Sequence, residues 1–221
     1  MTSTRRRRAT GRTRPAVIGL CRLVGRGVAR LLFRLEVHGA EHVPTSGPVL
    51  LAGNHSGFVD GPLVFLVTPR RAALLAKSEI FVGPGALVFG WLGLVPVHRG
   101  LADREALRAG LAVLSGGGAL GVFPEGTRGS GQLEQVNDGL AYLALRSQAA
   151  VVPIAVVGTA AAWPHGARVP RLRAPVRVVF GPAVRVEAAG DPRSRRTVAA
   201  AAEQLRVALV AHLRAAAEES T

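Results

Sequence analysis

The chain has little cysteine, lysine or aromatic side chain, and no acid before Glu36. Its single cysteine, Cys21, excludes an intramolecular disulfide and suits a reducing compartment. Aromatic residues make up only 5% of the chain and are not interleaved with the arginines, which argues against stacking on single-stranded nucleic acid. Lys77 is the only lysine among 28 basic residues. The preference for arginine is therefore general and does not by itself indicate phosphate recognition.

Long hydrophobic runs are also scarce. The longest uncharged candidate for a membrane span, residues 80–97, has 18 residues, the lower limit for a transmembrane helix. It contains Pro84, Pro96 and four glycines, which would break such a helix. We expect a loop, a short helix and a buried strand there. No secretory signal is expected, because arginines at 14, 22, 26, 30 and 34 interrupt the apolar residues of this segment.

The positive charge is concentrated at the N-terminus. The net charge is +14, and residues 1–35 carry ten basic residues and no acid, leaving 18 basic against 14 acidic residues in the remainder. Residues 1–14 have the composition of a disordered basic arm. Residues 15–35 predict an amphipathic helix, with arginines at 22, 26, 30 and 34 on one face and aliphatic residues at 20, 24, 28, 31 and 35 on the opposite one.

Two roles fit this helix. A basic amphipathic helix is typical of binding at an anionic membrane surface, and the adjacent basic arm favours that role. The alternative is an ordinary helix that packs on the core and leaves its arginines in water.

The rest of the chain, residues 36–221, is predicted to be one α/β domain. The whole chain of 221 residues is 48% apolar, which is enough for one sizeable core. Apolar runs and helical patterns alternate, which favours a mostly parallel or mixed sheet flanked by helices. Strands are expected at residues 48–52, 72–76, 94–98, 120–123, 151–157 and 176–180, helices at 62–67, 103–114, 138–146 and 194–217, and a long loop rich in Pro, Gly and Arg at 160–173.

One histidine and one acid stand alone in an apolar stretch. In the 27 residues from 43 to 69, only His55 and Asp60 can carry charge near neutral pH. They follow an expected strand, on the kind of loop where α/β sheets place ligand sites. At a spacing of five residues, their side chains would point about 140° apart on a helix or lie about 17 Å apart in a strand. They can meet only if the chain turns between them, and Gly57 permits such a turn.

Two interpretations of this stretch are open. If the side chains meet, Asp60 orients the imidazole and His55 can act as a general base, with the substrate supplying the attacking hydroxyl. Otherwise residues 54–56 form only a turn and Asp60 only caps a helix.

A second polar loop follows another expected strand at "VFPEGTRGSG", residues 122–131. Glu125 and Arg128 flank Gly126 and Thr127, so backbone N–H groups, a hydroxyl and a guanidinium could converge on a phosphate. A simple glycine turn closed by a Glu125–Arg128 pair is the alternative. "LVPVHRG" places Arg99 after a further strand.

Together these blocks resemble the glycerolipid acyltransferases of the 1-acyl-sn-glycerol-3-phosphate acyltransferase (PlsC-like) family. The family pattern is a His, four residues and an Asp, then an Arg block, a Phe-Pro-Glu-Gly-Thr-Arg block and an apolar block with a proline. The chain carries them in that order as "NHSGFVD", "LVPVHRG", "FPEGTRG" and "VVPIAVV", over about residues 35–185.

The resemblance implies acyl transfer by a catalytic His55–Asp60 pair. His55 would deprotonate the hydroxyl of a lysophosphatidic acid, which attacks an acyl-CoA or an acyl carrier protein thioester and gives phosphatidic acid. The acceptor site implied by the family comprises Arg99, Glu125, Gly126, Thr127 and Arg128. Neither a metal nor a tightly bound cofactor is implied. The expected location is peripheral, on the cytoplasmic face of the cell membrane, with no nucleic-acid partner.

Two positions depart from the family pattern. Gly57 stands where the family often has Ser, and Asn137 where it commonly has Lys. Because Asn137 removes a positive charge near the implied acceptor, another lysophospholipid or a glycolipid hydroxyl remains an alternative acceptor. A non-catalytic basic module that binds membrane or nucleic acid through its N-terminus is the alternative from a different class.

Overall fold

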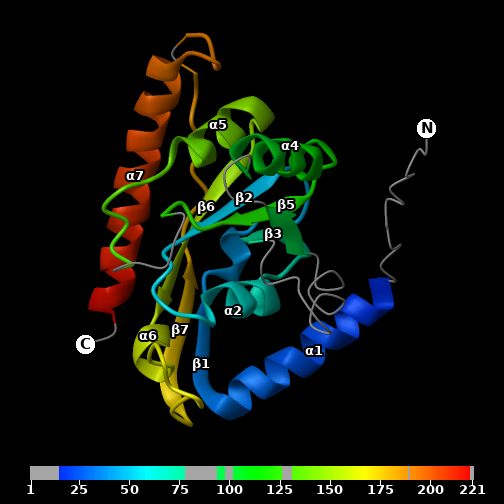
Figure 1. The fold of residues 1–221 in the computed structure, drawn as a ribbon, viewed down its shortest axis with the longest axis vertical. Helices are drawn as coiled ribbons and strands as arrows, with labels where there is room; N and C mark the ends of the chain where they lie inside the picture. Colours follow the sequence, from blue (N-terminus) through cyan, green and yellow to red (C-terminus); the bar gives the residue numbers. More distant parts are fainter. Residues whose placement is uncertain (1–14, 78–93, 98–101, 126–130, 189, 220–221) are drawn as a thin grey trace, which may run out of the picture.

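In the described part of the chain, seven strands form one mixed sheet through the centre of the protein (Figure 1). The structure is a computed structural model and describes residues 15–77, 94–97, 102–125, 131–188 and 190–219. The strands are β1 (Phe33–His38), β2 (Val49–Gly53), β3 (Ala72–Lys77), β4 (Leu94–Val97), β5 (Ala119–Val122), β6 (Ala150–Val157) and β7 (Ala174–Phe180). Their order is β1-β7-β6-β2-β5-β3-β4, and only the β6–β7 pair is antiparallel.

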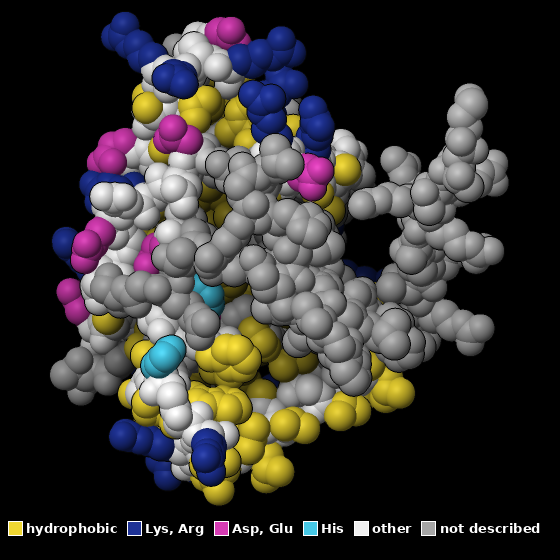
Figure 2. All heavy atoms as spheres, in the orientation of Figure 1, with side chains coloured by type: hydrophobic (Ala, Val, Ile, Leu, Met, Phe, Trp, Pro, Cys, Tyr) yellow, Lys and Arg dark blue, Asp and Glu magenta, His cyan; other side chains and the backbone are white. Residues whose placement is uncertain are grey.

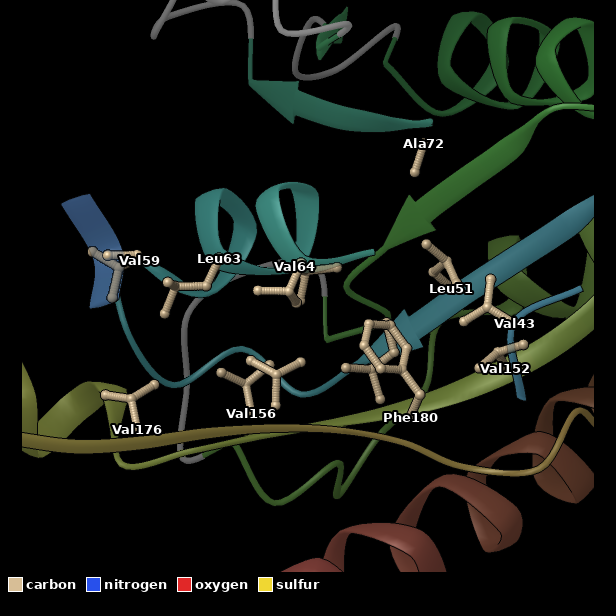
Figure 3. Packing of buried hydrophobic residues seen from close by; sticks show 14 of the residues in the cluster. Val43, Leu51, Val59, Leu63, Val64, Ala72, Val152, Val156, Val176 and Phe180 are labelled. Carbon is tan, nitrogen blue, oxygen red and sulfur yellow. The ribbon is translucent and has the colours of Figure 1, made fainter. Parts of the chain in front are cut away.

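Helices cover both faces of the sheet. They are α1 (Pro15–Leu32), the 3-10 turn η1 (Ala40–His42), α2 (Asp60–Val67), α4 (Ala102–Ser115), α5 (Asp138–Ser147), α6 (Thr159–Ala162) and α7 (Arg195–Glu218). One core cluster packs α1 and α2 against the sheet, and a second packs α4, α5 and α7 against the other face. Figure 3 shows α2 and a long C-terminal helix on opposite sides of the strands.

Strand β2 joins the two cores because both of its faces are buried. Leu51 contributes to the cluster under α2 and Leu50 to the cluster under α5, and neither is more than 1% exposed. Such a strand shows no alternation of polar and apolar residues, as expected for a parallel sheet covered on both sides. Burial of each of these leucines contributes about 1.5–3 kcal/mol, so the end of β2 is a firm base for the loop that follows.

The expected α/β architecture is confirmed, and the four helices and six strands expected by range within residues 36–221 are all present. The sequence prediction missed strand β1, the 3-10 turn η1 and the short helix α6, which occupies the start of the loop expected at residues 160–173. The helix expected over residues 15–35 ends at Leu32, because the next six residues alternate inward and outward and pair with β7. Residues 1–14 and most of the candidate span at residues 80–97 lie outside the described residues. No helix in the described ranges is both long and apolar enough to cross a bilayer.

In helix α1 the first arginines of the basic stripe turn inward, Arg30 is exposed, and most of the apolar stripe points outward. Arg22 is only 9% exposed, whereas Leu23 is 68% and Leu31 is 73% exposed. The outward apolar face comprises Leu20, Leu23, Val24, Val28 and Leu31. The predicted aliphatic stripe therefore does not pack on the core, and α1 packs there through Ile18 and Ala29 instead.

Arg22 and Arg26 face inward because they find hydrogen-bond acceptors there. Both guanidinium groups donate to the carbonyl oxygens of Leu66 and Thr68, at the C-terminal end of α2. The last carbonyls of a helix have no partner within the helix and carry its negative dipole end, so two cations stabilise them. Burial, together with Arg26 and Arg71, lowers the pKa of Arg22.

The Arg22 contact predicts a stability effect. Arg22→Met keeps the length of the side chain but leaves the buried Thr68 carbonyl with fewer donors, so the free energy of unfolding should fall by about 1–3 kcal/mol. Arg30→Met is the matched control, because Arg30 is exposed on the same helix. Urea unfolding of both variants tests this, and equal unfolding free energies would contradict it.

Candidate active site

Three loops meet at the carboxyl edge of the parallel strands. His55 follows β2, Glu125 follows β5 and Thr159 follows β6. Strand β4 points the same way, because it is parallel to β3, and β3 is parallel to β5. The other expected site residues, Arg99, Gly126, Thr127 and Arg128, lie outside the described residues.

Asn54 fastens the first of these loops to the sheet. Its side-chain amide donates to the Val156 carbonyl over 3.0 Å and accepts from the Val156 N–H over 2.8 Å. The side chain thus continues the pairing of β2 with β6 at the point where the backbone of β2 leaves the sheet. Because Asn54 is only 3% exposed, losing either bond would leave a buried polar group unpaired. His55 is the next residue, so its position is set by this anchor.

His55 and Asp60 meet, as the turn between them allows. The His55 Nδ1 atom lies 3.0 Å from Asp60 Oδ2. An ionised carboxylate can only accept, so Nδ1 carries the proton and the lone pair of the neutral ring lies on Nε2. This is the tautomer that a general base needs. The interpretation of residues 54–56 as a turn without a side-chain pair is therefore wrong.

The Asp60 carboxylate is fully buried, at 0% exposure. Its Oδ2 atom also accepts the Gly57 N–H over 2.7 Å. Asp60 is the first residue of α2, where the helix dipole favours negative charge. These contacts stabilise the carboxylate and fix its direction toward the imidazole.

Residues 123–125, which follow β5, also contact His55. The Phe123 ring stacks on the His55 ring, with centroids 4.4 Å apart and planes inclined by 23°. Glu125 Oε1 accepts the backbone N–H of His55 over 3.2 Å. Glu125 therefore connects the motif at residues 122–131 to the His55 motif, through a hydrogen bond to the His55 backbone.

Gly57 lacks a side chain because Thr159 fills the space. A Cβ atom on residue 57 would lie 2.6 Å from Thr159 Oγ1 and 2.7 Å from Thr159 Cβ. The same hydroxyl lies 3.4 Å from Ser56 Oγ. A Thr159 hydroxyl from the β6 loop thus occupies the place that a serine side chain at position 57 would need, which accounts for one departure from the family pattern.

Asn137, the second departure, lies beside the "FPEG" loop. Its backbone N–H donates to the Pro124 carbonyl over 3.0 Å, and its side chain is exposed. Position 137 therefore contacts the residue before Glu125, and its uncharged side chain is exposed there.

Sequence reasoning found the pair but missed most of its supports. The sequence pattern predicts Asn54 only as a turn residue and does not single out Thr159. An amide directly after an apolar strand is the sequence signal that could have identified Asn54. The Thr159 contact joins residues 103 positions apart, so no local sequence signal points to it. Among the described residues, no group of three or more His, Cys, Asp or Glu side chains is placed to hold a metal ion.

The close fit of Gly57 predicts a coupled stability effect. Gly57→Ser should lower the free energy of unfolding by about 1–3 kcal/mol, as overpacking does. Adding Thr159→Ala should restore part of that loss, because the residue that the new side chain meets is then smaller. Denaturant unfolding of the two single variants and the double variant tests this. Gly27→Ser is the control, since a Cβ there meets nothing within 4 Å, and additive losses would contradict the prediction.

The chain matches known acyltransferases over more than half of its length. The Acyltransferase family model matches residues 34–157. The chain is 30% identical to a chloroplastic 1-acyl-sn-glycerol-3-phosphate acyltransferase of Arabidopsis thaliana, over 61% of this chain and 39% of that protein. It is 32% identical to the human alpha form, over 55% and 44%. The match spans about two fifths of the length of these relatives.

A solved structure agrees with this. The fold resembles the crystal structure of the 1-acyl-sn-glycerophosphate (LPA) acyltransferase PlsC from Thermotoga maritima, with a TM-score of 0.67 and 25% identity, covering 90% of this chain and 80% of that one. The His55–Asp60 pair and most of the sheet lie inside the segment that the family model matches. The chain belongs to the Acyltransferase family.

Proposed function

We propose that the protein transfers a fatty acyl group from an acyl thioester to the free hydroxyl of 1-acyl-sn-glycerol-3-phosphate, giving phosphatidic acid. The observation that carries this is the His55–Asp60 hydrogen bond of 3.0 Å, which leaves His55 Nε2 free to take a proton. The names of the relatives support the acceptor and the reaction.

The reaction proceeds in one displacement. His55 Nε2 removes the proton of the acceptor hydroxyl as its oxygen attacks the thioester carbonyl carbon. The carbon–sulfur bond then breaks, and the leaving thiolate takes the proton from His55. Asp60 stabilises the imidazolium that forms in between. The donor is acyl-CoA or an acyl carrier protein, and the step requires no metal and no bound cofactor.

Arginine side chains hold the acceptor phosphate in this proposal. Arg99 and Arg128 follow the strands β4 and β5 along the chain, and a guanidinium binds a phosphate through two parallel hydrogen bonds. Gly126 and Thr127 add a backbone N–H and a hydroxyl. Because Asn137 adds no charge beside this loop, the arginines carry the recognition of the dianion alone. Another lysolipid acceptor is the alternative that this lost charge favours.

The proposed location is the cytoplasmic face of the membrane, with the outward apolar face of α1 in the lipid. Five aliphatic side chains of this face are at least 50% exposed, and the net charge of +10 in residues 1–35 attracts anionic lipid. An acceptor with a long acyl chain is dissolved in that membrane, so a surface-bound enzyme meets it directly.

The dyad predicts a specific pattern of activity loss. His55→Ala should abolish the transfer of labelled acyl groups from acyl-CoA to lysophosphatidic acid, and Asp60→Asn should lower kcat by about 10³–10⁴-fold, because the asparagine favours the wrong imidazole tautomer. Both variants must keep the wild-type circular dichroism spectrum, and full activity of folded His55→Ala would refute the mechanism.

The phosphate site predicts a different kinetic signature. Arg128→Ala should raise KM for lysophosphatidic acid about tenfold or more, with a smaller change in kcat, because one charged hydrogen-bonding partner is lost. The measurement compares lysophosphatidic acid with uncharged and zwitterionic lysolipid acceptors. An unchanged KM would remove the role assigned to Arg128, and a higher kcat/KM for another lysolipid would reassign the acceptor.

A further inference from the structure

The loop between α6 and β7, residues 163–173, exposes aliphatic and basic side chains together. Val169 and Leu172 are both 72% exposed. Arg168, Arg171 and Arg173 alternate with them and are exposed as well. The loop contains no acid, so its arginines have no counter-charge within it.

Hydrogen bonds fix the backbone conformation of the loop, and in this conformation its apolar side chains are exposed. The Arg171 N–H donates to the Ala162 carbonyl over 2.7 Å, and the Ala167 N–H to the Pro164 carbonyl over 3.0 Å. The Trp163 indole N–H donates to the Ala167 carbonyl over 2.9 Å. These bonds hold the backbone of the loop against α6, while Val169 and Leu172 project into solvent.

The loop is attached to the end of α1 and continues its apolar face. The Arg173 backbone N–H donates to the Leu32 carbonyl over 2.6 Å, and its guanidinium donates to the Arg30 carbonyl over 2.9 Å. Leu31, between these two acceptors, is 73% exposed. Figure 1 shows the loop beside the C-terminal end of α1, at the bottom of the view. Figure 2 shows hydrophobic side chains over the lower half of this face and along α1, with basic side chains at the lower edge.

The loop also leads to the catalytic histidine. Trp163, its first residue, packs edge-on against Phe58, with ring centroids 5.9 Å apart. Phe58 lies between His55 and Asp60 in the sequence and is 62% exposed. This contact between two aromatic rings therefore joins residues 163–173 to the segment that carries His55 and Asp60.

We propose that residues 163–173 form a second membrane-docking element that inserts Val169 and Leu172 into an anionic bilayer. Its three arginines then lie at the level of the lipid phosphates. Exposed aliphatic side chains next to arginines suit an anionic lipid surface, because apolar insertion and electrostatic attraction both contribute to the binding free energy. With α1, the loop gives two contacts, which orient the protein so that Phe58 and His55 face the membrane. The proposal extends the membrane location proposed above and does not depend on acyl transfer.

Vesicle binding tests the loop directly. The full chain is sedimented with phosphatidylcholine vesicles that contain or lack 30% phosphatidylglycerol (roughly the anionic share that gives strong surface attraction). Val169→Asp with Leu172→Asp should weaken binding to the anionic vesicles about tenfold or more, because two inserted side chains become charged. Val207→Asp is the matched control, since Val207 is 55% exposed on α7 and should leave binding unchanged. Equal binding of the loop variant and this control would overturn the proposal.

A fluorophore locates the insertion. In a Cys21→Ser background, an environment-sensitive dye on Leu172→Cys should shift to the blue when anionic vesicles are added, as should a dye on Leu23→Cys in α1. A dye on Val207→Cys should not shift. A shift at residue 23 without one at residue 172 would overturn the proposal.

Two further measurements distinguish a membrane from a second copy of the chain on this surface, and loop insertion from acyl transfer. If the loop variant removes a dimer of wild-type protein in analytical ultracentrifugation and leaves vesicle binding intact, the surface serves a second copy and the proposal fails. Because no thioester is present in the binding assay, His55→Ala should bind vesicles as wild type does. Loss of acyl transfer would therefore leave this proposal standing, and loss of loop insertion would leave the chemistry standing.

Discussion

The buried carboxylate of Asp60 is the constraint on which the site depends. A buried carboxylate at 0% exposure is costly unless it has hydrogen-bond donors, and here the His55 ring and the Gly57 N–H both donate to its Oδ2 atom. Both come from within five residues, so the chain must reverse tightly between residues 55 and 60. That reversal brings Gly57 against Thr159, where there is no room for a side chain. The pairing of His55 with Asp60 and the choice of glycine at position 57 thus follow from one requirement, which is to give the buried Asp60 carboxylate its donors.

Sequence patterns predicted the features that depend on local spacing. The apolar runs predicted six of the seven strands. Among these, β2 and β6 are buried on both faces, so they are recognised without any periodicity. β1 escaped because its alternating residues followed a helical pattern without a turn residue between them, and its strand character depends on pairing with β7. The His55–Asp60 contact was predictable as a possibility, since only a turn could join the two side chains.

The supports of the dyad were not predictable, because they join distant parts of the chain. Asn54 pairs with Val156, and Phe123 stacks on His55. Neither contact has a periodicity or a local spacing that a single sequence reveals. The orientation of α1 was open for the same reason. The position of its arginine stripe is decided by the carbonyl oxygens of Leu66 and Thr68, which terminate a helix more than 40 residues away.

Helix α2 links the His55–Asp60 pair to α1. Its first residue is Asp60, and its last carbonyls hold Arg22 and Arg26. A helix of eight residues is only about 12 Å long and is too short to be stable alone, so contacts at both ends position it. Since the inward face of α1 is fixed by these arginines, its outward apolar face has a defined direction relative to His55. A membrane bound to that face would therefore present its lipids to the dyad in one orientation.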